Sequence, residues 1–367
     1  MSKPLYIMIG GFLGAGKTTA VLQLARHLRA AGKRAGLITN DQSFGLVDTA
    51  LLTSQGFDVE EIGGGCFCCR FDSLIEASKS LSREATPDAF IAEPVGSCTD
   101  LRAAVSFPLR KIYGEDFHVA PLSVMADPLR IERILGLASG RAFAPKVVYV
   151  YEKQLEEADA IVINKRDLLD DGRMEGIRRA LAEQYPHARF FAVSARTGEG
   201  LTEWFDYILS SANSDREAPE VDYELYAEGE ALLGWLNCTV KVDSVAEFNG
   251  NAFVESIAGQ LREGIGNAEV AHLKMTLRPT EDGNDLAVVN LVRTDGVPEL
   301  SHRLAAPLQH GELLVNLRAE QDPETLWRIV RGALEASAAD AGVEVEIVTQ
   351  EYFRPAKPNP TWRMATA

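Results

Sequence analysis

A glycine-rich segment near the N-terminus constrains the fold of this chain more than any other feature. It reads Gly-Gly-Phe-Leu-Gly-Ala-Gly-Lys-Thr-Thr over residues 10–19 and directly follows an apolar run at residues 5–9. Glycines spaced in this way between a strand and a helix let backbone N–H groups converge on phosphate oxygens. The positive end of the following helix adds to the attraction. The sequence therefore predicts a nucleoside triphosphate site, against the alternative of a glycine-rich turn that binds nothing.

The side chains of this segment have separate expected roles. Lys17 is expected to reach the outer phosphates and to act in catalysis, whereas Thr18 is expected to hold magnesium. The other nucleotide contacts expected from the segment come from Gly11, Gly14, Ala15, Gly16 and Thr19.

Strand-like and helix-like patterns alternate over the first half of the chain. The apolar runs typical of strands lie at 5–9, 35–39, 89–92, 119–125, 160–163 and 190–193. Such alternation predicts an α/β fold with a mainly parallel sheet covered by helices on both faces.

The order of the patterns changes after a polar, proline-containing stretch at 210–221, which is typical of a linker. The later patterns are, in order, a strand at 236–242, a helix at 252–263, strands at 271–277, 286–292 and 313–318, a helix at 323–339 and a strand at 343–353. We therefore predict a nucleotide-binding domain over 1–212, a smaller α+β domain over 222–355 and an irregular tail over 356–367.

The choice of base is indicated by the run Asn164-Lys165-Arg-Asp167 at the end of a predicted strand. The Asp167 carboxylate can accept hydrogen bonds from the N1–H and 2-amino groups of guanine, whereas adenine would leave it unpaired. Lys165 would pack against the base, and Asn164 would brace neighbouring loops. Ser194 and Ala195 follow another strand and are expected to form a second base-contacting loop, with an ordinary turn as the alternative. These features favour GTP over ATP.

A second buried strand ends in an acid. Glu93 closes the run at 89–92, and Gly96 follows three residues later. A carboxylate here would hold magnesium through water and assist catalysis, and the Gly96 N–H would sense the γ-phosphate, as a nucleotide switch requires. The alternative for Glu93 is a surface acid at a strand end.

Three thiols lie within four residues in the run Gly-Gly-Gly-Cys-Phe-Cys-Cys at 63–69. Cys66, Cys68 and Cys69 can converge on one soft or borderline metal ion, because the preceding glycines permit a close turn. The alternatives are buried small residues at the start of a helix and a redox-active thiol pair. A thiolate site near the γ-phosphate would allow hydrolysis to change the affinity for metal.

The other two of the five cysteines carry weaker signals. Cys98 follows the Gly96 segment and is predicted to be a buried residue, with a role as a further metal ligand as the alternative. Cys238 lies in a strand pattern and is predicted to pack in a core. An odd, clustered set of cysteines indicates metal binding or reactivity rather than disulfide bonds.

Composition excludes several classes of partner. The net charge of −16 argues against nucleic acid or an anionic membrane as the main partner. No run of 18 apolar residues is present, so no membrane span is expected. The N-terminus leads directly into the first strand pattern without a signal peptide, and we expect a cytoplasmic protein.

Taken together, these motifs resemble those of the CobW-like family of P-loop GTPases, relatives of UreG and HypB. The resemblance is carried by the glycine-rich segment, by Gly-Cys-Phe-Cys-Cys at 65–69, by Glu-x-x-Gly at 93–96 and by the run at 154–168. It implies a slow GTPase that converts GTP and water to GDP and phosphate. It further implies that Cys66, Cys68 and Cys69 bind Zn²⁺, Co²⁺ or a similar ion, and that the protein delivers metal to, or matures, a client metalloenzyme.

Two departures from the family pattern stand out. The family has Asn-Glu-x-Gly after the second strand, where this chain has Asn40-Asp41-Gln42-Ser43. This region is the expected first switch loop, but the acid is shorter and the glycine is missing, so the sequence does not assign a role to Asp41. It leaves open which of Asp41 and the nearby Asp48 acts in the loop, if either does. The C-terminal part also lacks the histidine-rich stretch of many members, which argues against metal storage.

The function predicted from the sequence is a GTP-dependent metallochaperone, with a GTP-dependent dimer as a compatible state. A rival is a GTP-gated accessory protein for a corrinoid or other metallocofactor enzyme, in which no metal is transferred. A third class is a P-loop kinase acting on a small molecule. Metal stoichiometry with and without a GTP analogue separates the first function from the other two.

Overall fold

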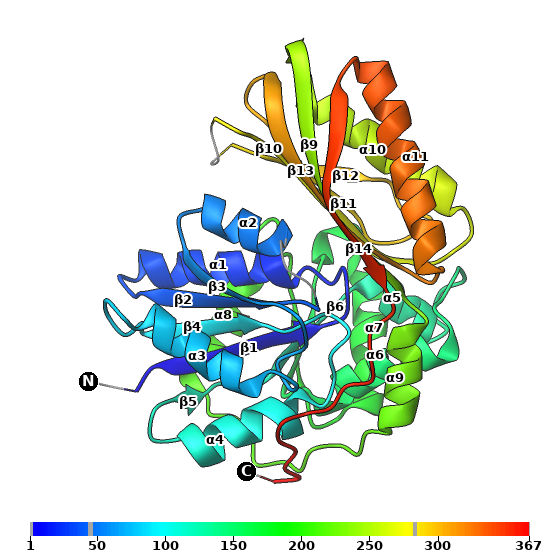
Figure 1. The fold of residues 1–367 in the computed structure, drawn as a ribbon. Helices are drawn as coiled ribbons and strands as arrows, with labels where there is room; N and C mark the ends of the chain where they lie inside the picture. The colour runs from blue at the N-terminus through cyan, green and yellow to red at the C-terminus, as the bar shows by residue number, and fades with distance from the viewer. Residues whose placement is uncertain (1–2, 43–46, 282–284, 367) are drawn as a thin grey trace. The chain divides into compact units, whose positions relative to one another are not determined.

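The computed structural model describes residues 3–42, 47–281 and 285–366 (Figure 1). These residues form two compact units. The first unit includes residues 3–42, 57–229 and 357–366, and the second includes residues 47–56 and 230–356. The units therefore differ in their bounds from the predicted domains: the linker and the tail both lie in the first unit, and a short segment after the second strand lies in the second.

A parallel sheet forms the centre of the first unit. Its strand order is β3-β2-β4-β1-β6-β7-β8, with the short β5 also paired to β1, and all of these pairs are parallel. The strands are β1 (Leu5–Gly11), β2 (Ala35–Asn40), β3 (Asp58–Ile62), β4 (Ala89–Glu93), β5 (His118–Val119), β6 (Ser123–Ala126), β7 (Ala160–Ile163) and β8 (Arg189–Ala192). The predicted α/β class is confirmed.

Two strands differ from the sequence prediction. The single strand predicted at 119–125 is two strands, β5 and β6, because Pro121 has no N–H to donate to a ladder. β3 has no counterpart in the prediction, since its Asp-Val-Glu-Glu-Ile sequence lacks the apolar character of the other strands.

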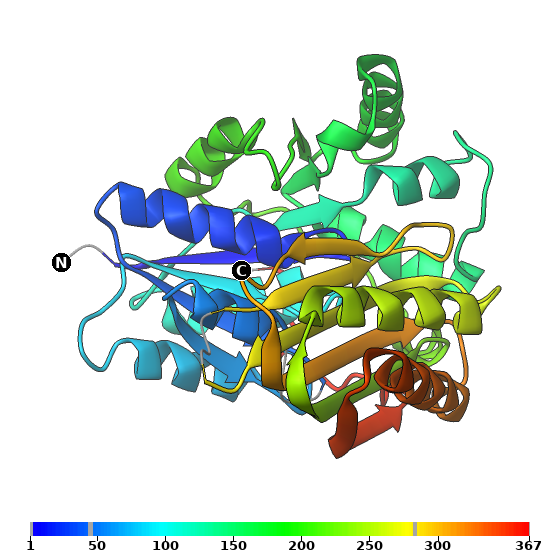
Figure 2. The ribbon, with the colours of Figure 1, turned by 90° about the horizontal axis from the view of Figure 1, so that it is seen from above.

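Helices cover both faces of this sheet (Figure 2). On one face, His27 of α1 (Lys17–Ala30) and Phe205 of α8 (Leu201–Ser210) have ring centroids 5.3 Å apart. On the other, Phe71 and Tyr113 join α3 to α4 with centroids 6.1 Å apart. The opposite placement of α1 and α3 follows from right-handed crossovers that run in opposite directions along the sheet. The other helices named here are α3 (Phe71–Leu81), α4 (Phe107–Tyr113), α5 (Pro128–Ile134), α6 (Pro145–Glu157), α7 (Asp171–Gln184) and α9 (Tyr223–Ala231).

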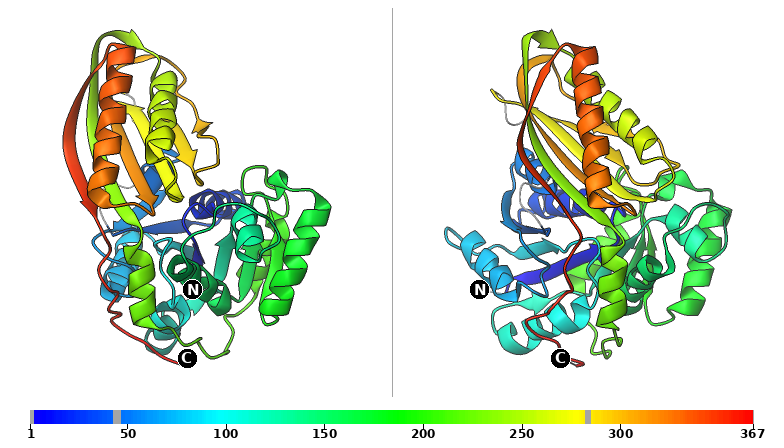
Figure 3. Two further views of the ribbon diagram at one scale, coloured as in Figure 1. Left: turned by 90° about the vertical axis from the view of Figure 1, so that its right-hand side faces the viewer. Right: turned by 45° about the vertical axis from the view of Figure 1, so that its right-hand side comes forward.

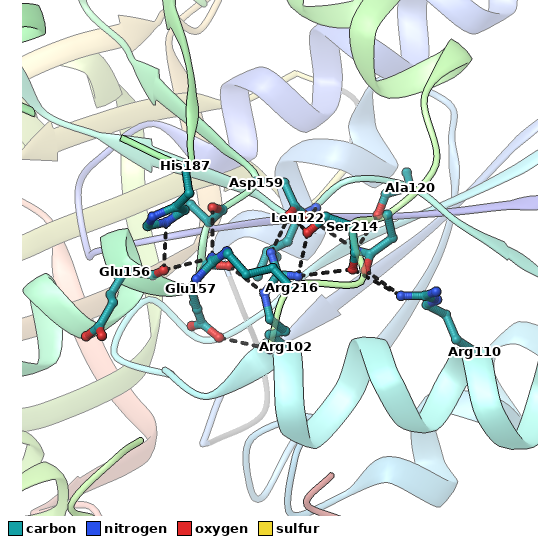
Figure 4. A network of polar contacts seen from close by, with 12 residues as sticks. Arg102, Arg110, Ala120, Leu122, Glu156, Glu157, Asp159, His187, Ser214 and Arg216 are labelled. Atoms are coloured by element: carbon teal, nitrogen blue, oxygen red, sulfur yellow. Dashed lines mark hydrogen bonds and ion pairs between the residues drawn. The ribbon is translucent and has the colours of Figure 1, made fainter. Parts of the chain in front are cut away.

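Residues 213 and 214, in the polar stretch after α8, are bound to the first unit by a buried network of hydrogen bonds and ion pairs (Figure 4). Arg102, in the short π-helical segment η1 (Arg102–Ser106), forms an ion pair with the side chain of Asp159. Its Nη1 also donates to the Ser214 carbonyl (3.3 Å) and hydroxyl (3.0 Å) oxygens. Asn213 donates from Nδ2 to the Ala120 carbonyl oxygen (3.1 Å). Because its polar groups are paired in this way, the stretch belongs to the first unit instead of acting as a free spacer.

The second unit is an antiparallel sheet with two long helices packed on one face. Its strand order is β12-β11-β10-β13-β9-β14. An apolar core joins alternate residues of the sheet to α10 and α11. The elements are β9 (Gly234–Phe248), α10 (Gly250–Ile265), β10 (Val270–Pro279), β11 (Ala287–Leu291), β12 (Glu299–His302), β13 (Leu308–Ala319), α11 (Pro323–Ala341) and β14 (Glu344–Phe353). The predicted α+β domain is present, with β12 as an additional strand.

The second unit also includes a helix from the N-terminal part of the chain, α2 (Val47–Ser54). Asp48 forms an ion pair with Lys274 of β10, and the Val47 N–H donates to Asn316 Oδ1 on β13 (3.1 Å). Leu273 and Met275, on either side of Lys274, point into the core under α10 and α11. Since neighbouring residues of a strand face opposite ways, α2 lies on the other face of this sheet. No helix among the described residues has the length and hydropathy that a bilayer span needs.

Candidate functional site

The glycine-rich segment forms a loop between β1 and α1 that requires glycine. Gly11, Gly14 and Gly16 have φ values of 125°, 77° and 93°, a region that L side chains rarely adopt. A Cβ on Gly16 would lie 2.3 Å from Asn164 Nδ2, and one on Gly11 would lie 2.2 Å from the Met125 carbonyl oxygen. The loop is therefore held close to the ends of β6 and β7.

Thr18 and Glu93, both expected to hold magnesium, meet at the carboxyl edge of the sheet. Thr18 Oγ1 donates to Glu93 Oε1 over 3.0 Å, and both side chains are buried. Lys17 is also buried, with Nζ 3.5 Å from the Phe12 carbonyl oxygen of its own loop. A hydroxyl and a carboxylate side by side are oxygen donors of the kind that magnesium prefers, so the residues present fit the ion.

The segment after Glu93 packs directly on the phosphate loop. A Cβ on Gly96 would lie 2.7 Å from Leu13 Cδ2 and 3.0 Å from Leu13 N, so only glycine permits this approach. The buried Gln154 of α6 donates from Nε2 to the carbonyl oxygens of Gly96 (3.0 Å) and Cys98 (2.7 Å). The positioning role of Gln154 was not predicted, although an amide among the buried residues of a helix was a signal that could have found it.

The last residue of α6 supports the next part of the same segment. Glu157 is completely buried and accepts hydrogen bonds from the Arg102 N–H (2.9 Å) and from Thr99 Oγ1 (3.2 Å). Burial raises the pKa of Glu157 to about 8. α6 therefore holds the chain at several points between Gly96 and Arg102, and Glu157 is a second residue that sequence reasoning missed.

The predicted base-binding residues lie around the loop. Asn164 donates from Nδ2 to the Ala15 carbonyl oxygen (2.8 Å) and accepts at Oδ1 from the Ala195 N–H (2.9 Å). It thus connects the phosphate loop to the segment that contains the buried Ser194. Asp167 is exposed, in the short 3-10 segment η2 (Arg166–Leu168). Its side chain is accessible for contact with a base.

Lys165 has a partner that the sequence did not suggest. Its backbone is left-handed, with φ of 55°, and its Nζ donates to the Gly14 carbonyl oxygen (2.7 Å) and to Asp127 Oδ2 (2.6 Å). Asp127 is buried and also caps α5 by accepting from the Leu129 N–H (2.9 Å). The side chain of Asp127 therefore fixes the lysine next to the phosphate loop.

The three thiols of the Cys-x-Cys-Cys motif converge. Cys66 Sγ lies 2.9 Å from both Cys68 Sγ and Cys69 Sγ, and the last two sulfurs are 3.8 Å apart. A tetrahedral zinc site with Zn–S bonds of about 2.3 Å separates its sulfurs by roughly 3.8 Å. Shifts of about an ångström would place the three sulfurs around one ion. Cys66 and Cys68 are buried, whereas Cys69 is partly exposed.

Asn40, the last residue of β2, holds the loop that carries these thiols. Its Nδ2 donates to the carbonyl oxygens of Ile62 (2.8 Å) and Gly65 (2.7 Å), and its Oδ1 accepts from the Phe67 N–H (2.9 Å). Gly65 has a φ of 148°, and Phe67 is fully buried beside the cluster. Sequence reasoning placed Asn40 only at the start of a switch loop and missed this role.

Hydrogen bonding within the cluster controls the charge of the thiols. Contacts with Cys68, Cys69 and Cys98 hold the pKa of Cys66 well below its ordinary value. The hydrogen bond to Cys66 raises the pKa of Cys69 to about 11. Cys98, itself buried, lies within hydrogen-bonding reach of the Cys66 sulfur.

The two acids of the expected first switch loop have different surroundings. The Asp41 N–H donates to the Ile62 carbonyl oxygen (3.2 Å), so Asp41 still pairs with the end of β3. Asp48 is in α2, with Lys274 as its ion-pair partner. Ser43, which stands where the family has glycine, lies outside the described residues.

The sequence profile of the CobW/HypB/UreG nucleotide-binding domain matches residues 5–192, half of the chain. The chain belongs to the CobW/HypB/UreG family. The match covers the phosphate loop, the cysteine motif and the run from Asn164 to Asp167.

Three similar proteins have names that refer to zinc. The chain is 30% identical over 190 residues to the zinc chaperone CobW of Sinorhizobium sp., covering 47% of this chain and 53% of that protein. It is 39% identical over 90 residues to the zinc chaperone YeiR of Escherichia coli, covering 24% of this chain and 27% of that protein. It is 25% identical over 244 residues to the zinc-regulated GTPase metalloprotein activator 1 of Schizosaccharomyces pombe, covering 64% and 55%. The chain thus spans about half or less of the length of these relatives.

Solved structures give weaker similarities. HypB from Helicobacter pylori in complex with nickel is 17% identical, with a TM-score of 0.42 over 56% of this chain and 86% of that one. The Zn(II)-bound YjiA GTPase from E. coli is 14% identical, with a TM-score of 0.35 over 92% and 99%. The family assignment therefore rests on the sequence match.

Proposed function

We propose that this protein binds and hydrolyses GTP and uses the nucleotide state to control a divalent transition metal held by Cys66, Cys68 and Cys69. The observation that carries the proposal is the convergence of three sulfurs, two of them buried, in the unit that also contains a complete phosphate-binding loop. Three thiols without a disulfide form a donor set suited to zinc or cobalt.

The nucleotide would be held by groups that already surround the loop. Lys17 is the proposed ligand of the outer phosphates, Asp167 reads guanine, and Lys165, fixed by Asp127, packs along the base. Gly11, Gly14, Ala15, Gly16 and Thr19 supply the remaining loop contacts, together with Ser194 and Ala195 beside the base.

Magnesium would be held by Thr18 and, through water, by Glu93, which are hydrogen-bonded to each other in this structure. The bound ion would bridge phosphate oxygens and neutralise developing charge. Among the residues that the structure describes, no arginine or glutamine has an assigned place at the γ-phosphate, so we propose slow hydrolysis by the isolated protein.

Coupling between the two sites has a physical route through the segment that follows β4. Gly96 approaches the phosphate loop, and Cys98 lies beside the thiol cluster only two residues later. One amide, that of Gln154, holds both carbonyl oxygens. A shift of Gly96 toward a γ-phosphate would therefore change the position of Cys98, and with it the space available for a metal.

The metal is cargo in this proposal, and the acceptor is a client metalloenzyme or another cofactor-dependent protein. A cytoplasmic location and a GTP-dependent dimer belong to the same proposal. The relatives named as zinc chaperones support zinc as the first metal to test.

The decisive experiment is calorimetric titration of metal-free protein with Zn²⁺ and with Co²⁺, in the presence of GDP or of a non-hydrolysable GTP analogue. We expect one metal per chain and an affinity that differs between the two nucleotides by about 5- to 150-fold, the usual range for linked sites. Reciprocity requires bound metal to change the affinity for the GTP analogue by the same factor. Equal affinities with both nucleotides would disprove the coupling, and no metal binding would favour an accessory protein with structural cysteines.

A further inference from the structure

The last residues of the chain return to the first unit after the strand β14 of the second. Residues 357–366 form no helix or strand and run as an extended segment, drawn in dark red at the C-terminal end in Figures 1 and 3. Lys357 forms an ion pair with Glu224 of α9, and the Met364 N–H donates to the Ala103 carbonyl oxygen of η1 (3.0 Å). The segment is therefore attached at both ends.

Between these attachments the segment crosses the cysteine motif. The Thr361 N–H donates to the Cys68 carbonyl oxygen (2.8 Å), and Thr361 Oγ1 donates to the Cys69 carbonyl oxygen (3.3 Å). The Asn359 N–H donates to Cys69 Sγ itself (3.3 Å). Cys69 is the one partly exposed thiol of the three, so the segment lies on the accessible side of the cluster.

The strongest attachment is to a buried acid. Arg363 Nε donates to Asp100 Oδ2 (2.8 Å), and the Tyr223 hydroxyl donates to the same oxygen (2.6 Å). The Asp100 side chain is fully buried, whereas that of Arg363 is 37% exposed. Asp100 lies two residues after Cys98, so the anchor of the tail is on the segment that connects the phosphate loop to the thiols.

We propose that residues 359–364 are a cover of the metal site, which closes the outer side of the thiol cluster and must detach before metal can enter or leave quickly. The inference rests on the proposed metal function for its consequence, but the cover itself is a property of the metal-free protein. The Asn359 N–H holds the cover directly on the Cys69 sulfur. Arg363 is a positioning residue that keeps this cover in place.

The first test uses metal-free protein and an aromatic disulfide that reacts with accessible thiols. Arg363→Ala should increase the reaction rate of Cys69, identified by peptide mass spectrometry, by about tenfold or more, because a charge-assisted anchor to a buried acid is lost. Arg331→Ala is the matched control, since Arg331 forms an exposed ion pair with Glu335 on α11. Equal rates in the two variants would overturn the cover, and this result needs neither metal nor nucleotide.

The second test measures transfer of zinc from the loaded protein to an excess of a chromogenic chelator. Release should be faster by a similar factor in Arg363→Ala and unchanged in Arg331→Ala. Asn359→Pro, which lacks the N–H, should also release zinc several-fold faster, whereas Asn359→Ala keeps the N–H and should behave as wild type. Identical release from all four variants and wild type would overturn the proposal. If the wild-type protein binds no zinc, the proposed function is refuted. The labelling experiment then decides by itself whether residues 359–364 cover the thiol cluster.

Discussion

The phosphate loop and the cysteine cluster lie in the same unit but are suited to opposite kinds of ligand. The loop offers backbone N–H groups, Lys17 and the oxygen pair of Thr18 and Glu93, a set for phosphate and a hard cation. The cluster offers sulfur only, from Cys66, Cys68 and Cys69. This contrast in donor chemistry would keep magnesium and a transition metal at separate sites, although both proposed sites contact one short segment after β4.

The two sites also differ in how they are supported. The phosphate loop owes its shape to its own glycines and to Asn164. The thiol loop is held by Asn40, 25 residues from Gly65, and by the tail, whose Asn359 lies 290 residues from Cys69. A site held by several separate attachments can be opened by releasing one of them, which would suit the metal delivery that we propose.

The largest expected effect comes from removing two sulfurs, which should abolish metal binding and leave nucleotide binding intact. Cys66→Ser combined with Cys69→Ser should lower the affinity for Co²⁺ by at least about a thousandfold, because most of the metal's binding energy comes from thiolate ligands. The near-ultraviolet charge-transfer band and the intense visible bands of tetrahedral Co²⁺ should both be lost. GTP affinity, measured by calorimetry, should stay nearly unchanged. Wild-type Co²⁺ spectra in the double variant would contradict the assignment of the ligands.

Lys17→Ala should have the opposite effect and impair the nucleotide site while leaving the metal site intact. Loss of the proposed phosphate ligand should reduce GTP hydrolysis by about 10²- to 10³-fold and weaken nucleotide binding, since positive charge at the phosphates is removed. Binding of Co²⁺ in the absence of nucleotide should remain as in wild type. Phosphate release and cobalt spectra measured on the same preparation check both halves, and unaltered hydrolysis would exclude Lys17 from the site.

Base choice should be altered without effect on the thiols by Asp167→Asn. The variant presents a donor to the guanine 2-amino group in place of an acceptor, so we expect GTP affinity to fall about 30- to 150-fold, the value of one charge-assisted hydrogen bond. Xanthosine triphosphate, which carries an oxygen at that position, should bind the variant better than GTP does. Competition between the three nucleotides measures this, and equal affinity of the wild type for ATP and GTP would refute the guanine assignment.

The last prediction concerns protein stability rather than ligand affinity, in the segment shared by both sites. The pKa of Glu157 is about 8 in the folded chain, above the ordinary value of 4.5, so the folded state keeps a proton that the unfolded state has lost between these values. The free energy of unfolding should therefore fall as pH rises from about 5 to 8, by an amount on the order of a few kcal/mol.

Glu157→Gln should flatten this decline because the amide does not titrate and can still accept from the Arg102 N–H. Glu156→Gln, at the neighbouring position, is the control that should keep the wild-type profile. Urea unfolding at several pH values measures the effect. Parallel profiles for wild type and Glu157→Gln would show that this carboxyl does not titrate in the window.

Much of the first unit follows from local sequence. The apolar runs of β1, β4 and β7 are buried on both faces of a parallel sheet, so their pattern alone indicates strands. β3 was not predicted because three of its five residues are acidic, so it lacks the apolar pattern of a buried strand. α2 could not be assigned to the second unit from its sequence, since its partners Lys274 and Asn316 lie more than 200 residues away.

The sequence by itself determined the chemistry that we propose for this protein, because the glycines, the lysine and the three cysteines lie within short segments whose spacing can be read directly. Only the tertiary structure decided what holds those loops. Gln154, Glu157, Asp127 and the tail from Asn359 to Arg363 act through contacts distant in sequence. The spacing of residues within a motif does not predict such contacts, since buried polar groups meet their partners only once the sheet and helices have packed.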